Sequence, residues 1–204
     1  MPAALLSVIF VVLLVIAIPV SITLGIASVL PSVFDPSFTV GAKYLIRAMF
    51  GGLDSFPLLA VPMFVLSGII MAKGGISKKL FDVFAFFLGN FTAGMPCAVI
   101  VTCLFYGAIS GSAPATVTAV GSMTIPILSA LGYDRTFSTA IVAVAGGLGV
   151  IIPPSIPFIM YGMASGASVS SLFLAGVIPG LMIGLLLMLY AIYHCRRYGE
   201  DREK

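Results

Sequence analysis

The chain has 204 residues, of which 60 % are apolar and 8 % are charged, and its mean hydropathy is +1.21. A soluble domain carries about 25 % charged residues, because a folded globule needs a polar shell. The net charge is only +3, and four of the ten bases lie in the last nine positions. These figures exclude a soluble enzyme, a nucleic-acid-binding protein and a disordered chain. They predict an all-α protein that crosses a lipid bilayer several times.

The few residues that could carry chemistry are scattered. Cys97, Cys103 and Cys195 form an odd set without metal-ligand spacing, so we interpret them as small apolar residues. His194 adjoins two arginines near a membrane boundary, where we expect a snorkelling side chain rather than a catalytic one. The sequence therefore predicts neither an enzyme nor a protein with an organic cofactor.

The N-terminal region is predicted to form one long helix and one short helix. Residues 3–30 are apolar or small throughout and would span about 42 Å as a helix. Because the hydrocarbon core is about 30 Å thick, we expect this helix to tilt or to bend at Pro19. Residues 39–50 carry Lys43 and Arg47 four positions apart, a pattern that favours a helix lying at the membrane interface.

Two further crossings are expected at 54–72 and 77–95. Gly74 and Gly75 separate them, and Ser77 would cap the second helix. From Val83 to Tyr133 the chain then carries no acid or base.

A first interruption falls at Ser110-Gly111-Ser112, whose composition is that of a turn. The apolar run 97–109 before it is about 20 Å long as a helix, too short to cross a bilayer. Pro114 suits the first turn of a new helix, because its missing N–H needs no intrahelical partner there. We therefore predict a re-entrant helical hairpin over 96–133. The alternative is two ordinary spans joined by a short outer loop.

A second interruption falls inside the apolar stretch 136–165, which is about one span long. Residues 146–149 contain three glycines, and residues 153–157 contain three prolines, a combination that cannot be continuous helix. We predict a helix broken near the middle of the membrane. The alternative is a proline kink without a site.

Two broken helices in one chain indicate a shared site. Each break exposes carbonyls on one side and N–H groups on the other. Carbonyls and hydroxyls together suit a hard cation such as Na⁺, and N–H ends suit an anionic group. The expected sodium ligands are the hydroxyls of Ser110 and Ser112 and the carbonyls of Gly149, Ile152, Pro153 and Pro154. The expected substrate-binding residues are Gly111, Thr116 and Ser155.

Basic residues predict the orientation. With five crossings and a hairpin that returns to its own side, an outside N-terminus places seven bases inside and three outside. The inside set is Lys43, Arg47, Arg135, Arg196, Arg197, Arg202 and Lys204, and the outside set is Lys73, Lys78 and Lys79. Because five is odd, a second copy joined to this C-terminus would run upside down, as in inverted-repeat transporters.

Several motifs occur together in one serial order. They are Val61–Gly68, Lys73–Leu80, Gly107–Ser112, Gly149–Pro157 and Leu172–Gly180. At these segments the chain resembles the large membrane subunit of tripartite ATP-independent periplasmic (TRAP) transporters, the DctM-like family. The resemblance runs from about Leu5 to Arg197. Family members are about twice as long, so the resemblance covers only the first half of such a subunit.

The resemblance implies a Na⁺-coupled, elevator-type carrier that imports small organic acids across the bacterial inner membrane, for which the basic residues predict a periplasmic N-terminus and a cytoplasmic C-terminus. It also implies three protein partners besides the lipid bilayer, and no nucleic acid. These are a small four-helix membrane subunit, a periplasmic substrate-binding protein and the second half of the large subunit.

The expected organisation follows the interruptions. It comprises a scaffold helix and interfacial arm helix at 1–53, two transmembrane helices at 54–95, the re-entrant hairpin at 96–133, the broken helix at 134–167, and a last transmembrane helix with a cytoplasmic tail at 168–204. The hairpin and the broken helix would form the transport domain. The rival hypothesis is a non-transporting structural subunit or a channel component. No ring of acids or bases favours a channel, and a structural role leaves both interruptions unexplained.

Overall fold

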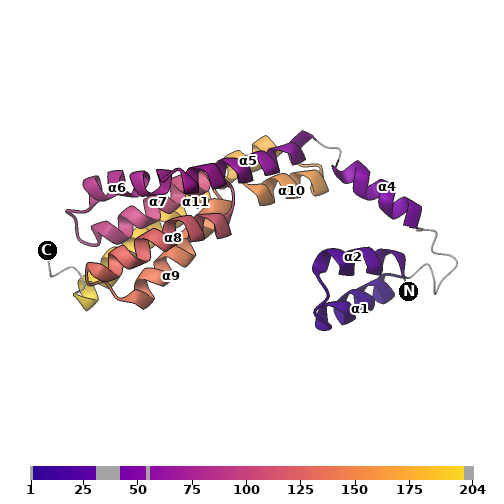
Figure 1. Cartoon of the computed structure of the whole chain (residues 1–204), viewed down its shortest axis with the longest axis horizontal. Helices are drawn as coiled ribbons and strands as arrows, with labels where there is room; N and C mark the ends of the chain where they lie inside the picture. The colour runs from indigo at the N-terminus through magenta and orange to yellow at the C-terminus, as the bar shows by residue number, and fades with distance from the viewer. Residues whose placement is uncertain (1, 31–41, 54–55, 200–204) are drawn as a thin grey trace. The chain divides into compact units, whose positions relative to one another are not determined.

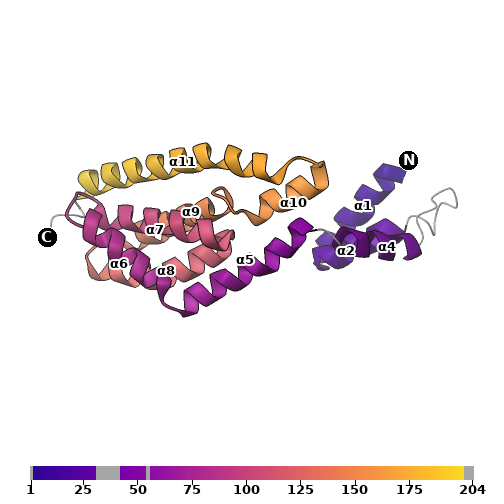
Figure 2. The ribbon, with the colours of Figure 1, turned by 90° about the horizontal axis from the view of Figure 1, so that it is seen from above.

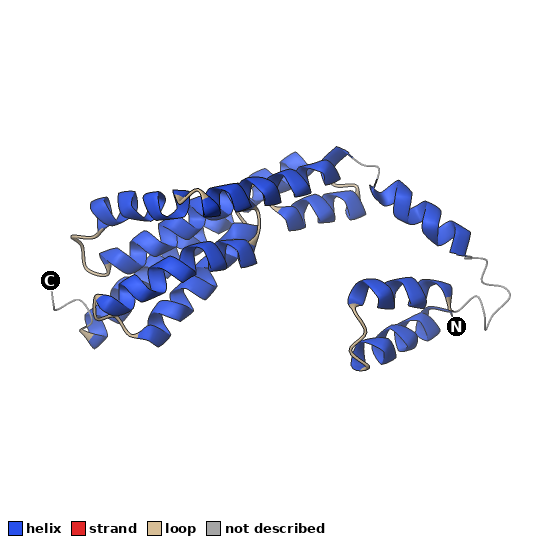
Figure 3. Ribbon diagram, viewed as in Figure 1, coloured by secondary structure: helices blue, strands red, loops and turns tan. Residues whose placement is uncertain are grey.

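The computed structural model describes residues 2–30, 42–53 and 56–199 (Figure 1). Within these ranges the regular structure is helical and contains no strand (Figure 3), which agrees with the predicted all-α class. The chain divides into two compact units, Met1–Phe56 and Pro57–Lys204. Residues 31–41 and the tail 200–204, with the bases Arg202 and Lys204, lie outside the described residues.

The first unit does not contain the single long helix expected over 3–30. α1 (Pro2–Val15) and α2 (Val20–Val29) are separate helices that pack against each other. The chain turns between them because Ala17 takes a left-handed conformation (φ 64°) and Pro19 has no N–H to continue a helix. With 14 and 10 residues, α1 and α2 would reach only about 21 Å and 15 Å. The prediction of one tilted spanning helix is therefore wrong, although the break falls at the expected proline.

The short helix expected at 39–50 is present as α4 (Ala42–Leu53). Lys43 and Arg47 are exposed and lie four residues apart, so they share one face of the helix. Its location at the membrane interface stays a prediction.

The second unit is a helical bundle around α7 (Figure 2). Its elements are α5 (Phe56–Lys73), α6 (Ile76–Leu88), α7 (Gly94–Ser110), α8 (Ala113–Ala130), α9 (Arg135–Gly146), the 3₁₀ turn η1 (Gly147–Val150), α10 (Ile156–Ser165) and α11 (Val169–Tyr198). α7 packs against α6, α8, α9 and α11, and Val99, Ile100 and Cys103 are fully buried on it. The core is therefore centred on the leading helix of the predicted hairpin.

α5 and α6 differ from the two opposite crossings expected at 54–72 and 77–95. They are bent by 68° at the glycine break, whereas a return through the membrane would need a reversal near 180°. α6 has 13 residues, about 20 Å, and ends at Leu88 instead of near residue 94. Ser77 does not cap it, because Gly75 already occupies the N-cap position (φ 71°) and Ser77 lies buried inside the helix.

Two helices, α8 and α11, are long and apolar enough to cross a bilayer, and the bent pair of α5 and α6 would be a third candidate span. These counts cover the described residues and rest on length and composition. α11 has 30 residues and runs the length of the second unit, and Gly176, Gly180 and Gly184 lie buried on one of its faces. The described helices thus offer up to three candidate spans, fewer than the five crossings expected, and the number of crossings stays a prediction.

The ends of α9 and α11 meet at one end of the bundle. Asp134 caps α9 by accepting a hydrogen bond from the Phe137 amide at 2.8 Å. Phe137 in turn stacks on His194 of α11, with ring centroids 4.1 Å apart. Cys97, Cys103 and Cys195 are buried and form no disulfide, as expected of small apolar residues.

Candidate functional site

α7 and α8 form a helical hairpin whose tip is the predicted turn. α7 ends at Ser110, and Gly111 takes the left-handed conformation (φ 63°) that glycine adopts without steric cost. The Gly111 amide donates to the Gly107 carbonyl at 2.8 Å, which closes the end of α7. Ser112 is extended, and Pro114 lies in the first turn of α8, as the sequence predicts.

Three residues at the tip form a ring of hydrogen bonds. The Ser112 amide donates to Ser110 Oγ at 3.4 Å, Ser110 Oγ lies 3.1 Å from Thr116 Oγ1, and the Thr116 hydroxyl donates to the Ser112 carbonyl at 2.9 Å. When the Thr116 hydroxyl donates to the Ser112 carbonyl, Ser110 is left as the donor between the two side chains, and its hydroxyl also lies 3.4 Å from that carbonyl. Each hydroxyl oxygen then keeps at least one free lone pair. Ser110 and Thr116 are almost completely buried, at 1 % and 0 % exposure.

The second interruption is a true break in the helix. The α-helical pattern of α9 stops at Gly146, η1 follows, and regular structure resumes at Ile156 after the cis Pro153–Pro154 peptide bond. Ser155 caps α10, because its hydroxyl accepts from the Phe158 amide at 3.3 Å and donates to the Val150 carbonyl at 2.6 Å. The structure therefore favours a break over a simple proline kink.

The two interruptions contact each other. The Ile156 amide at the start of α10 donates to the Gly111 carbonyl at the hairpin tip, at 3.3 Å. Gly107 and Gly149 approach so closely that a Cβ on Gly107 would overlap the backbone of Gly149. A Cβ on Gly149 would lie 2.6 Å from Thr116 Oγ1. The oxygen ring is thus covered directly by backbone of the second break.

The predicted ligands do not all join this cluster. Ser110, Ser112 and Gly149 meet there, and Thr116, predicted to bind substrate, belongs to the ring itself. Ser112 contributes its backbone groups to the ring, where the sequence had suggested its hydroxyl.

The remaining predicted residues flank the cluster. The Pro154 carbonyl lies against Gly111, 2.9 Å from where a Cβ would be. The buried Ile152 packs its side chain against Gly180 of α11, and Pro153 is half-buried beside it. Ser155 is buried, and its hydroxyl is engaged by Val150 and Phe158.

A groove of about 390 Å³ opens beside the tip. Gly68 and Val65 of α5 line one side, and Thr118 of α8 and its N-cap Ser112 line the other. Most of its lining is apolar, and Ser110 and Tyr106 of α7 also line it.

Sequence reasoning missed Tyr106 and Gly68. The Tyr106 hydroxyl donates to the Gly68 carbonyl at 2.9 Å, and both residues are buried. The buried hydroxyl of Ser77 on α6 lies near the same Tyr106 side chain without forming a well-directed hydrogen bond. A lone glycine inside an apolar helix is a signal of close packing, and this signal was present at Gly68.

Two interrupted helices whose ends meet around buried neutral oxygens, in a chain this apolar, define a membrane-embedded helical protein. Broken helices that meet at a shared site are a feature of secondary transporters. Residues 7–203 match the family described as the Tripartite ATP-independent periplasmic transporter, DctM component. The chain belongs to this family.

Several bacterial TRAP transporter permease proteins are similar to this chain over nearly all of its length. It is 43 % identical over 194 residues to an isethionate TRAP transporter permease protein, DctMQ, of Oleidesulfovibrio alaskensis, which covers 95 % of this chain and 30 % of that protein. It is 37 % identical over 195 residues to the C4-dicarboxylate permease protein DctM of Vibrio cholerae, covering 95 % and 42 % of the two chains. The ectoine permease protein TeaC of Halomonas elongata is 35 % identical, with 94 % and 45 % covered. The chain thus spans less than half the length of each of these relatives.

Proposed function

We propose that this chain is part of the large membrane subunit of a Na⁺-coupled TRAP transporter that imports small organic acids through the bacterial inner membrane. The observation that carries the proposal is the buried oxygen ring of Ser110, Ser112 and Thr116, closed over by Gly149. A structural subunit has no need of two interrupted helices whose ends meet.

The ring supplies the oxygens for the coupling cation. Ser110 and Thr116 offer hydroxyl lone pairs, and the ends of α7 and η1 offer carbonyls without intrahelical partners. Ile152, Pro153 and Pro154 would contribute carbonyls from the second break. These neutral ligands suit Na⁺ in a carrier, because a fixed carboxylate would remain as a bare buried charge whenever the cation left.

The N-terminus of α8 supplies the groups for an acidic substrate. Its first-turn N–H groups lie at the positive end of the helix dipole, and such ends bind carboxylates without a basic side chain. The Ile156 and Phe158 amides of α10 are already engaged by Gly111 and Ser155. The groove reaches the first turns of α8, beside Ser112. Gly111, Thr116 and Ser155 would hold the substrate through this backbone arrangement. The names of three relatives specify isethionate, C4-dicarboxylates and ectoine.

The hairpin tip is proposed to end inside the membrane. It meets the start of α10, and α10 continues for 10 residues, about 15 Å, beyond that contact. The tip would therefore lie within the span formed by α9 and α10, as a re-entrant hairpin requires. The length of α8 alone would also allow an ordinary crossing, so the contact with α10 supports the re-entrant arrangement.

The hairpin and the broken helix together would form the moving part of an elevator, and residues 1–53 would belong to the scaffold. A second hairpin and broken helix, in inverted orientation, would come from the rest of the large subunit. The expected partners are a small four-helix membrane subunit and a periplasmic substrate-binding protein. The N-terminus would be periplasmic and the C-terminus cytoplasmic, as the basic residues indicate.

Uptake into proteoliposomes tests the proposal. The assembled transporter, with this chain in its large subunit and the binding protein outside, is given succinate, isethionate or ectoine with an inward Na⁺ gradient or an equal K⁺ gradient. We expect accumulation of one substrate only with Na⁺. Accumulation with K⁺ alone would contradict Na⁺ coupling, and downhill flux without the binding protein would favour a channel component.

A further inference from the structure

α5 touches the oxygen ring from outside the hairpin. Among the α5 residues whose burial the structure describes, Gly68 alone is buried. Its neighbour Ser67 is half-buried, and Ile69 is exposed. A Cβ built on Gly68 would lie 3.2 Å from the Cβ of Ser110 and 3.4 Å from its Cα. The α5 backbone therefore rests directly against the residue that provides one oxygen of the ring.

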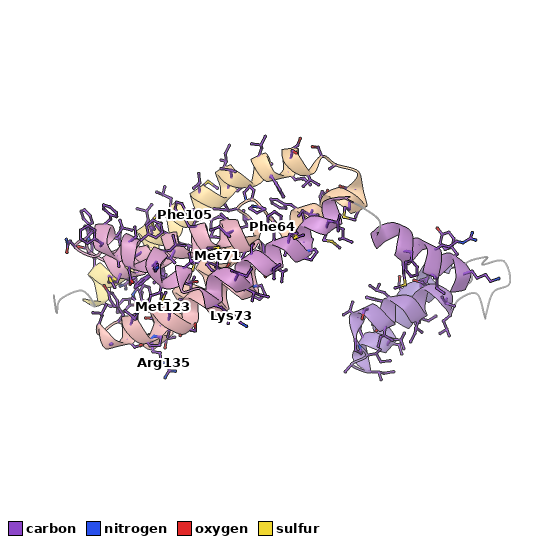
Figure 4. The ribbon with its side chains drawn as sticks, turned by 45° about the horizontal axis from the view of Figure 1, so that its top comes forward. Phe64, Met71, Lys73, Phe105, Met123 and Arg135 are labelled. Carbon is purple, nitrogen blue, oxygen red and sulfur yellow. The ribbon has the colours of Figure 1, made fainter. Side chains whose placement is uncertain are left out.

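Tyr106 holds this contact in place. It precedes Ser110 by one helical turn, so both residues lie on the same face of α7. Its hydroxyl donates to the Gly68 carbonyl at 2.9 Å, and the side chain is 1 % exposed. Figure 4 shows α5 beside the bundle, with Phe64 and Met71 labelled on it, and Met71 packs against the core one turn beyond Gly68. One buried hydrogen bond and one glycine thus fix α5 against α7 at the level of the ring.

We infer that Tyr106 and Gly68 are positioning residues for the cation site, and that α5 closes one wall of it. The inference rests on the proposed function for its link to Na⁺, and on the contact itself for its structural part. Ser110 belongs to the ring and has the α5 backbone against its Cα and Cβ, so its hydroxyl is held in the orientation that the cation requires. When the Tyr106 hydroxyl is lost, α5 is free to move away from Ser110, and the groove between α5 and α8 widens.

Two variants separate the roles of the hydrogen bond and the close approach. Tyr106→Phe keeps the ring and removes the hydroxyl, whereas Gly68→Ala inserts a methyl group between α5 and Ser110. Tyr161→Phe is the matched control for the first, because Tyr161 is exposed on α10. Gly147→Ala is the control for the second, because a Cβ there meets nothing within 4 Å and its φ is −60°.

The first measurement does not depend on Na⁺. Ala119 lines the groove and is half-buried, so Ala119→Cys reports opening through its rate of reaction with a small maleimide in the assembled transporter. The buried native cysteines set the background, measured in the chain without this substitution. Tyr106→Phe and Gly68→Ala should each accelerate labelling by about threefold to tenfold, the range of one net hydrogen bond. The two controls should label at the parent rate.

The second measurement is the Na⁺ concentration for half-maximal uptake. It should rise in both variants by about the same factor, with the maximal rate less affected. Labelling at the parent rate in both variants would overturn the inference. If uptake by the parent transporter does not respond to Na⁺, the proposed function fails, and the labelling rates still decide whether α5 is held by Tyr106.

Discussion

The Ile156 amide donates a hydrogen bond to the Gly111 carbonyl at 3.3 Å, and this bond joins the two interruptions of the chain. Gly111 forms the hairpin tip between α7 and α8, and Ile156 begins α10 after the second break. The non-helical backbone of each segment is therefore covered by the other. Buried irregular backbone survives only when its polar groups are satisfied in this way, so the interruptions form one junction.

The close approach of Gly107 to Gly149 is expected to be essential for this junction. Gly107→Ala would push a methyl group into the backbone of Gly149, and the atoms it would meet are all backbone atoms that cannot rotate aside. We expect a loss of stability of about 1–3 kcal/mol, the usual cost of overpacking. Thermal unfolding in detergent measures it. Gly147→Ala, where a Cβ has open space, should leave the midpoint unchanged, and equal midpoints for both variants would contradict the contact.

The oxygen ring predicts an order among three substitutions. Ser110→Ala and Thr116→Ala each remove a hydroxyl from the ring, whereas Ser112→Ala leaves the carbonyl that Thr116 contacts. The Na⁺ concentration for half-maximal uptake should rise by about tenfold in the first two variants and change little in the third. The Thr116→Ser variant keeps a hydroxyl at this position, so it should retain most of the Na⁺ affinity of the parent. A larger effect of Ser112→Ala than of Ser110→Ala would show that the Ser112 hydroxyl is the ligand.

The parts of the site that could be predicted from sequence depend on local backbone chemistry. Glycine in the turn at Ser110–Ser112, Pro114 in the next first turn and the proline cluster after Gly149 each limit the backbone by themselves. The two interruptions of the helices could therefore be predicted from the sequence, and so could the class of protein. The sequence also predicted that the two breaks share a site, but which atoms meet there depends on tertiary packing between residues such as Gly111 and Ile156, 45 positions apart.

The features of the fold that the sequence did not predict also depend on tertiary packing. Ala17 adopts a left-handed conformation that its residue type does not signal, so the reversal between α1 and α2 could not be foreseen beyond a bend at Pro19. The glycines after Lys73 indicate where α5 ends but not the direction of α6. The Tyr106–Gly68 hydrogen bond links residues 38 positions apart, and only the packing of α5 on α7 shows it.

Asp134 should make the stability of the N-terminal end of α9 sensitive to acid. The pKa of its carboxyl is lowered, chiefly because the carboxylate accepts the hydrogen bond from the Phe137 amide. A carboxyl whose pKa is lower in the folded state stabilises the fold above its unfolded pKa, and this contribution is lost as the pH falls through the folded pKa. The melting temperature of the parent should therefore fall more steeply between about pH 5 and pH 3 than that of Asp134→Asn, which retains a capping oxygen without a titrating group.

The control for this prediction is Asp134→Ala, which loses the cap altogether. It should melt below the parent at pH 7, and its melting temperature should show the same shallow pH dependence as that of Asp134→Asn. Equal pH dependence of the parent and Asp134→Asn would show that the Phe137 hydrogen bond does not set the pKa of Asp134.

The membrane orientation can be tested at two positions that the structure places at one end of the bundle. Phe137 at the start of α9 stacks on His194 near the end of α11, so the segments just before α9 and just after α11 must face the same side of the membrane. Arg135, Arg196 and Arg197 gather at this end, and bases favour the cytoplasmic side whatever the number of crossings made by the preceding helices. Reporters active only in the periplasm, inserted after Gly132 or fused after Gly199, should therefore both stay silent. Activity of both reporters would reverse the proposed orientation and leave the fold intact. Activity of one alone would contradict the packing of α9 against α11, because stacked rings 4.1 Å apart cannot lie on opposite sides of a bilayer.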